Sequence, residues 1–106
     1  MIYEYRVYEA LPGKMGTLVE IMKVAVPVFK RLGMNPTPIW KPSVGANNNS
    51  IVYMLAFKDM EDRNRKWDAF RDDAEWKEKR AKFGPDPVTE TQFNSFLKPT
   101  DHSPAK

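Results

Sequence analysis

Segments rich in apolar, aromatic and β-branched residues, separated by Gly, Pro and Asn turns, recur along the chain and predict β-strands. Residues 2–9 are rich in aromatic and β-branched side chains and form the first expected strand. Residues 51–57 are apolar almost throughout, as in a central strand covered on both faces. Residues 36–44 contain three prolines, which favours an edge or irregular strand, and an asparagine-rich turn at 45–50 joins these two segments as a hairpin. The last expected strand is 87–97.

Helical periodicity appears between these strands. Apolar residues step by three and four from Met15 to Leu32, which predicts one amphipathic helix. Pro27 lies inside this stretch and is expected to kink or divide the helix, because it cannot donate a backbone hydrogen bond. Asp59 is expected to cap a second helix, and Asp72 a short third one that ends at Gly84-Pro85.

The resulting order is strand, helix, strand, strand, helix pair, strand. This order is typical of the split βαβ arrangement, so the sequence predicts an α+β, ferredoxin-like subunit. One layer of helices covers one face of the sheet, while the other face still carries apolar side chains. We therefore expect a homodimer formed through the sheet.

Length and composition indicate one globular domain. The chain has 106 residues, 42% of them hydrophobic and 29% charged. We expect a folded domain over residues 1–99 and a flexible C-terminal tail over 100–106. The sequence has no apolar run near the ~18 residues of a membrane span and no secretory signal pattern, so we expect a cytoplasmic protein without membrane insertion.

Charge and residue usage exclude several functional classes. Between Lys58 and Lys82, nine basic residues are met by eight acidic ones, so a nucleic-acid-binding patch is not expected. The chain has no cysteine, and its single histidine is His102 in the expected tail. A catalytic triad, a zinc centre and a histidine-ligated haem are therefore not expected. No phosphate loop or dinucleotide fingerprint is present, and we expect no metal and no cofactor.

The first strand carries the most informative polar pattern. Glu4, Arg6 and Tyr8 share one face of this strand because side chains alternate across it. Together with Trp40 and Tyr53 on neighbouring strands they form a candidate ligand pocket. Arg6 would hold an anion, Glu4 would orient Arg6 or take a proton, the tyrosines would donate hydrogen bonds, and Trp40 would form an aromatic wall.

A purely structural explanation of the same residues stays open. Glu4 and Arg6 are equally compatible with an ion pair across the sheet or the dimer seam, because buried charges persist only when they are compensated. Trp67 and Phe70 in the second helix are expected to anchor it to the sheet. Arg63 is expected to be solvated or paired with acidic residues of its own helix.

The combined order of several motifs resembles the NIPSNAP family. The motifs are MIYEYRVY at residues 1–8, PGK at 12–14 and DDAEW at 72–76. Further matching features are Gly33, Trp40, Arg63 and Lys98-Pro99. The resemblance covers residues 1–99 and implies a dimeric α/β barrel, in which the sheet of one ferredoxin-like subunit pairs with that of its twin. The wider superfamily includes cofactor-independent monooxygenases, haem-degrading enzymes and isomerases.

The third strand departs from this family pattern. Many relatives resemble Asn-x-Val-x-His-Leu-Trp there, whereas residues 49–55 of this chain are NSIVYML, with Tyr53 in the place of the histidine. A phenol has a pKa near 10 and is a poor base at neutral pH. Two functions are therefore expected from the sequence. The first is a small-ligand-binding barrel, such as a cofactor-independent oxygenase or isomerase acting on a flat acidic or hydroxylated compound. The alternative is a non-catalytic homodimeric scaffold.

Overall fold

The computed structural model describes residues 1–45 and 47–105. Ala46 of the expected turn and Lys106 of the expected tail lie outside the described residues. The elements in chain order are β1 (Ile2–Ala10), α1 (Met15–Arg31), β2 (Asn35–Pro36), β3 (Ser50–Phe57), α2 (Met60–Asp72), α3 (Ala74–Ala81) and β4 (Thr89–Leu97).

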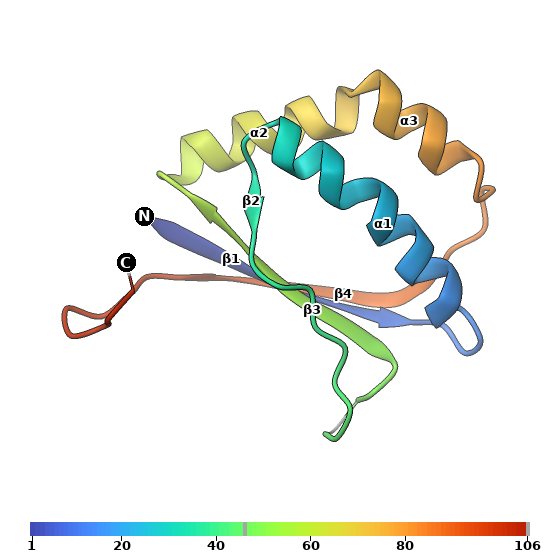
Figure 1. Cartoon of the computed structure of the whole chain (residues 1–106), viewed down its shortest axis with the longest axis horizontal. Coiled ribbons are helices and arrows are strands. Elements are labelled where there is room, and N and C mark those ends of the chain that lie inside the picture. The colour runs from blue at the N-terminus through green and yellow to red at the C-terminus, as the bar shows by residue number, and fades with distance from the viewer. Residues whose placement is uncertain (46, 106) are drawn as a thin grey trace.

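These elements form two layers, with the helices on one side of a single sheet (Figure 1). The sheet has the order β2-β3-β1-β4, and β1 pairs antiparallel with both β3 and β4. The expected ferredoxin-like α+β fold is confirmed. The long strands β1 and β3 occupy the centre, so side chains from both of them lie directly beneath the helices.

The face assignment of β1 also follows the expected alternation. Glu4, Tyr8 and Ala10 are buried beneath the helices, whereas Tyr5 points to the opposite face and is exposed. Residues directly opposite in an antiparallel pair share a face, so Tyr53, which pairs with Arg6, also lies on the helix side. The polar row of the first strand, which consists of Glu4, Arg6 and Tyr8, thus lies in the interior of one subunit.

Helix α1 supplies much of the apolar layer above the sheet. Its buried residues are Leu18, Ile21, Met22, Ala25, Val28 and Phe29. Of the two expected effects of Pro27, a kink or a division, the division is excluded, because α1 runs from Met15 to Arg31 as one helix with Pro27 inside it. Pro27 is exposed, so its ring lies on the side of the helix away from the core.

The hairpin between the second and third strands is confirmed only in part. Strand β2 is at the sheet edge as expected, but it contains only Asn35 and Pro36. Beyond it, Trp40 forms an isolated antiparallel bridge with Val52. Because proline has no backbone N–H, the prolines of this segment interrupt the hydrogen-bond ladder that a full strand needs.

The two short helices begin at acidic caps. The Asp59 side chain accepts a hydrogen bond from the backbone N–H of Asp62, as expected for α2. For α3 the cap is Asp73 rather than the expected Asp72, and it accepts from the N–H of Trp76. Asp73 also receives two hydrogen bonds of 2.8 Å from Arg31 at the end of α1, which joins the helices.

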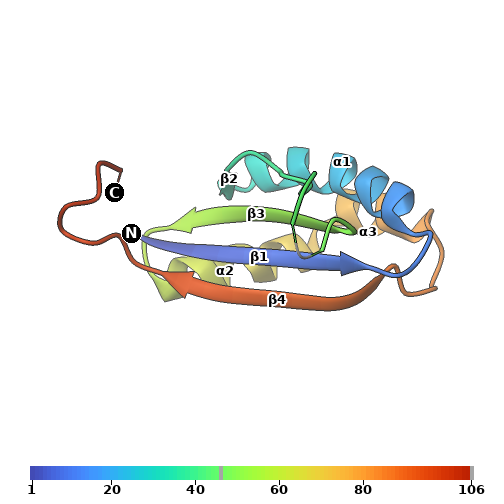
Figure 2. The ribbon, with the colours of Figure 1, turned by 90° about the horizontal axis from the view of Figure 1, so that it is seen from below.

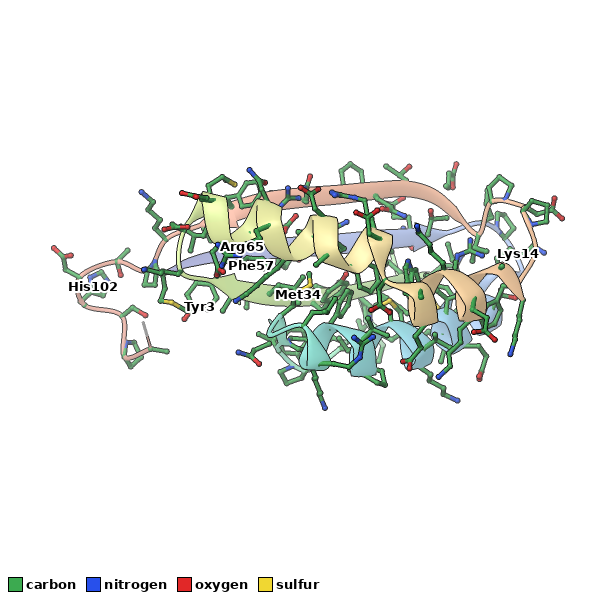
Figure 3. The ribbon with its side chains drawn as sticks, turned by 90° about the horizontal axis from the view of Figure 1, so that it is seen from above. Tyr3, Lys14, Met34, Phe57, Arg65 and His102 are labelled. Atoms are coloured by element: carbon green, nitrogen blue, oxygen red, sulfur yellow. The ribbon has the colours of Figure 1, made fainter. Side chains whose placement is uncertain are left out.

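The second face of the sheet is not covered by any helix of the chain in the described residues (Figure 2). Tyr5, Phe93 and Leu97 are exposed, and Phe93 leaves 52% of its surface open. The segment after β4 extends past the end of the sheet instead of folding over this face, and it carries His102 (Figures 1 and 3). In the part of the chain described here, no helix has the length and apolar character needed to cross a membrane.

Candidate functional site

The first half of the polar row is a closed ionic network centred on Glu4. The Glu4 side chain is 0% exposed. Its Oε2 accepts from Arg6 Nη1 at 2.6 Å and from Asn94 Nδ2 at 3.0 Å. Arg63 donates to both carboxylate oxygens at 3.1 and 3.0 Å, and Trp67 Nε1 donates to Oε1 at 2.8 Å. Strands β1 and β4 and helix α2 therefore meet at a single carboxylate.

This network sets the protonation state of Glu4. Burial alone would raise the pKa of the Glu4 carboxyl, because it disfavours the charged form. The hydrogen bonds from Arg63, Asn94 and Trp67 and the charge of Arg6 outweigh burial and lower the pKa to about 2. Glu4 therefore orients Arg6, which was one of its expected roles, and it cannot take a proton at neutral pH, which was the other.

Two of the residues that donate to Glu4, Arg63 and Trp67, make contacts that the sequence did not predict. Arg63 was expected to be solvated or paired on its own helix, and this is wrong, since it binds Glu4 across the interior. Trp67 anchors α2 as expected, but it also donates to the carboxylate. Arg63 and Trp67 are four residues apart and so lie on one face of a helix. That spacing, with a carboxylate in the first strand, is the signal that points to their joint role.

The second half of the row is a chain of hydrogen bonds from Arg6 through two tyrosines. Arg6 Nε donates to the Tyr8 hydroxyl at 3.0 Å, and the hydroxyls of Tyr8 and Tyr53 are 2.6 Å apart. The two rings meet edge to face at 5.5 Å between centroids. Four of the five residues selected from the sequence thus lie in one continuous polar network: Glu4, Arg6, Tyr8 and Tyr53.

The protein surroundings of this hydrogen-bonded series determine the protonation states of Arg6 and Tyr53. Burial lowers the pKa of Arg6, but Tyr8, Tyr53 and Glu4 raise it by a larger amount, so the guanidinium stays protonated. Burial, followed by the influence of Tyr8, raises the pKa of Tyr53 well above 10. Tyr53 is therefore a neutral phenol and cannot act as a base.

A cavity of about 310 Å³ lies between the sheet and the helices, directly above Arg6 and Tyr8. Its lining is mainly apolar and aromatic and includes Leu18, Ile21, Met22, Phe29, Trp67, Phe70 and Trp76. The Arg6 Cζ lies 4.5 Å from the centre of the Trp67 ring, so the guanidinium stacks on this wall. Pro87 and Gln92, which also line the cavity, are exposed and mark its mouth at the start of β4.

A smaller recess of about 230 Å³ adjoins this cavity and shares Arg6, Trp67 and Gln92 with it. The recess is also lined by Arg63 and Arg71. Because Arg6 and Arg63 share the single carboxylate of Glu4, this cluster has an excess positive charge. An anion entering the recess would meet that charge together with Arg71.

Trp40 is the selected residue that the structure places elsewhere. It lines a separate apolar groove of about 440 Å³ between α1 and the segment after β2, together with Ile39 and Ile51. The expectation that it forms a wall of the Glu4–Arg6–Tyr8 pocket is wrong. The reason is the sheet order, because Trp40 pairs with β3 at the edge opposite β4, while the cavity opens toward β4.

The geometry limits the chemistry that this site can support. Across residues 1–45 and 47–105, no group of three or more His, Cys, Asp or Glu side chains is arranged to hold a metal ion. His102 is exposed on the segment beyond β4, at the end of the molecule away from α3 (Figure 3). The cavity is lined by two arginines, Arg6 and Arg80, by the Tyr8 hydroxyl and by aromatic walls, which can bind and stabilise negative charge.

Comparison with known proteins identifies the family to which the chain belongs. The model of the NIPSNAP family matches residues 3–104. The chain belongs to the NIPSNAP family. No curated protein matches the chain significantly. The family assignment leaves the chemistry to be argued from the site.

Solved structures of NIPSNAP proteins share this architecture. A NIPSNAP family protein from Agrobacterium tumefaciens is 21% identical, with a TM-score of 0.86 over 99% of this chain and 98% of that one. An uncharacterised NIPSNAP domain protein from Burkholderia xenovorans is 23% identical, with a TM-score of 0.81 over 98% and 99%. A Mycobacterium tuberculosis protein is 12% identical, with a TM-score of 0.65 over 96% and 97%. At these identities the similarity establishes the fold alone.

Proposed function

We propose that this NIPSNAP protein binds a small, flat, acidic compound in the cavity between the sheet and the helices. The observation that supports the proposal most directly is the position of Arg6, a cation with little exposure at the floor of an aromatic cavity that opens at Gln92. Ligand sites are typically apolar cavities of this size with a few convergent polar groups.

The hydrogen bonds of Arg6 leave part of its guanidinium for a ligand. Nε donates to Tyr8 and Nη1 to Glu4, and within the described residues Nη2 donates to no side chain. A planar guanidinium with free N–H groups suits a carboxylate or an enolate. Glu4 holds this guanidinium in place, because it is itself fixed by Arg63, Trp67 and Asn94.

The cavity is better suited to stabilising an anion than to creating one. Glu4 has a pKa of about 2, and the pKa of Tyr53 is raised well above 10, so neither removes a proton at neutral pH. A compound that is already an anion at neutral pH, such as a flat or hydroxylated carboxylic acid, fits this arrangement. In a cofactor-independent oxygenation or isomerisation at this site, solvent water or the substrate itself would have to take the proton, and Arg6 would stabilise the enolate that remains.

Tryptophan fluorescence offers a direct test. Trp67 and Trp76 line the cavity, whereas Trp40 lines the other groove, so Trp40→Phe leaves only cavity tryptophans as reporters. We expect 3-phenylpropanoate to change this emission with saturation, and the uncharged 3-phenylpropanol to bind more weakly. Titration of both compounds measures the contribution of the carboxylate. Identical binding of acid and alcohol, or binding of neither, would contradict the proposal.

A second candidate function, a homodimeric scaffold, is favoured by the uncovered sheet face. Tyr5 is 36% exposed at the centre of this face, next to Met54 and Ser95 on the flanking strands. Such a face is costly to leave in water, and a second copy of the sheet would cover it. This proposal is compatible with ligand binding, because the cavity lies on the opposite side of the sheet.

Sedimentation at micromolar concentration tests the dimer. We expect about twice the chain mass of 12.3 kDa for the natural protein and the single-chain mass for Tyr5→Asp, whose carboxylate would be buried in the interface. Asp86→Asn, at an exposed position outside the sheet, is the control and should keep the dimer. A natural protein that sediments at the mass of one chain would contradict the scaffold.

A further inference from the structure

The tyrosine pair above Arg6 has a hydrogen-bond direction that follows from burial. The Tyr53 side chain is fully buried, and Tyr8 is the only hydrogen-bond partner of its hydroxyl within the described residues. If Tyr8 donated to Tyr53, the Tyr53 hydrogen would remain buried without an acceptor, which is strongly unfavourable. The Tyr53 hydroxyl therefore donates to Tyr8.

This direction leaves the Tyr8 hydrogen for the cavity. A phenol oxygen has two lone pairs and one hydrogen. The lone pairs of Tyr8 are taken by the Tyr53 hydroxyl at 2.6 Å and by Arg6 Nε at 3.0 Å. The remaining hydrogen has no acceptor among the described side chains, and Tyr8 lines the cavity whereas Tyr53 does not.

Two unused donors thus lie side by side on β1. Arg6 and Tyr8 are in direct contact, and both line the cavity. A ligand that uses both must therefore carry two acceptor oxygens close together, on the same or adjacent carbon atoms. When both oxygens of a carboxylate bind the free N–H groups of the Arg6 guanidinium, no oxygen is left for the Tyr8 hydrogen. A 2-oxo acid, its enol form or a 2-hydroxy acid offers a third oxygen beside the carboxylate.

We propose that the ligand is an aromatic acid with an oxo or hydroxyl oxygen next to the carboxylate, and that Tyr8 donates a hydrogen bond to this second oxygen. Tyr53 is a positioning residue that directs the Tyr8 hydrogen into the cavity. This inference rests on the proposed function, because it requires an acid held by Arg6. Beyond the proposed function, the inference specifies the chemical class of the ligand and gives Tyr8 and Tyr53 separate roles.

A matched pair of probes tests the inference. Phenylpyruvate and 3-phenylpropanoate have the same carbon skeleton and differ in the oxygen at carbon 2. We expect the natural protein to bind phenylpyruvate about tenfold more tightly by calorimetry, as for one additional hydrogen bond. Tyr8→Phe should remove this preference while retaining 3-phenylpropanoate binding, and Tyr53→Phe should reduce it.

Control variants separate this role from folding. Tyr5→Phe removes a hydroxyl from the same strand on the opposite face and should leave both affinities unchanged. Tyr8→Phe leaves the Tyr53 hydroxyl without a partner, so the double variant Tyr8→Phe/Tyr53→Phe, which removes both hydroxyls, is measured beside it. The double variant should be folded in a thermal melt and show no preference between the probes.

The outcomes distinguish the inference from the function on which it rests. Equal affinity of the natural protein for both probes would overturn the role of Tyr8 and leave acid binding intact. A preference for phenylpyruvate that persists in Tyr8→Phe would also overturn the role of Tyr8 and leave acid binding intact. Binding of neither probe would overturn the proposed function together with this inference. Loss of the preference in Tyr8→Phe, with 3-phenylpropanoate still bound, would support the assignment.

Discussion

The two halves of the polar row on β1 differ in how completely their hydrogen bonds are satisfied. Glu4 receives donors from four side chains and is closed off from solvent. Two and four residues further along, Arg6 and Tyr8 retain unused donors and line an open cavity. One strand therefore carries a structural charge network at one end and a binding surface at the other, and Arg6 belongs to both.

This difference separates residues whose loss should unfold the protein from residues whose loss should change binding. Removing one member of a buried charge network leaves its partners unpaired, which costs far more than the pair contributes to stability. A donor that faces a cavity is hydrated when no ligand is present, so its removal affects mainly the bound state. Three predictions test this division, beginning with the largest effect.

Glu4→Gln should lower the free energy of unfolding by about 3–5 kcal/mol, because the partly buried guanidinium groups of Arg6 and Arg63 would lie beside a neutral side chain. Urea denaturation measures the change. The control is Glu20→Gln, which removes an exposed carboxylate 2.9 Å from Lys23 and should cost less than about 1 kcal/mol. Equal stability of Glu4→Gln and the natural protein would show that the network is not structural.

Acid should remove the same stabilisation progressively. The pKa of Glu4 is about 2 in the folded protein and 4.5 in its unperturbed state. A lowered pKa stabilises the fold fully above pH 4.5, and the contribution declines as pH falls toward 2, because the unfolded chain then binds the additional proton. Its full size is about 3 kcal/mol. Urea denaturation from pH 6 to pH 2 should show this loss in the natural protein, and a parallel decline in Glu4→Gln would exclude Glu4 as its source.

Arg6→Lys should have the smallest effect on the fold and a clear effect on binding. Lysine keeps the positive charge beside Glu4 but lacks the planar fork, so 3-phenylpropanoate should bind more weakly by about 1–3 kcal/mol. Arg65→Lys makes the same change at an exposed position of α2 and should leave the affinity unchanged. If Arg6→Lys bound the probe normally, and Arg6→Ala only weakened the fold and the dimer, Arg6 would belong entirely to the structural half.

Alternation along the chain was sufficient to predict much of this molecule. The polar row of Glu4, Arg6 and Tyr8, the edge position of the proline-rich segment and the cap at Asp59 all depend on local rules of strand and helix geometry. The prediction of one helix layer on one sheet is also confirmed. These features depend on neighbours within a few residues, which a sequence displays directly.

Tertiary structure alone decided which partners each polar residue meets. Arg63 reaches Glu4 across the interior, although acidic residues lie closer to it along its own helix. Trp40 lies beyond β3 and outside the cavity, and Tyr53 is buried behind Tyr8 instead of facing a ligand. Such partners depend on strand order and on how α2 packs over β1, which bring together residues about sixty positions apart. A residue's face follows from its local period, but its neighbour across that face follows only from the packed fold.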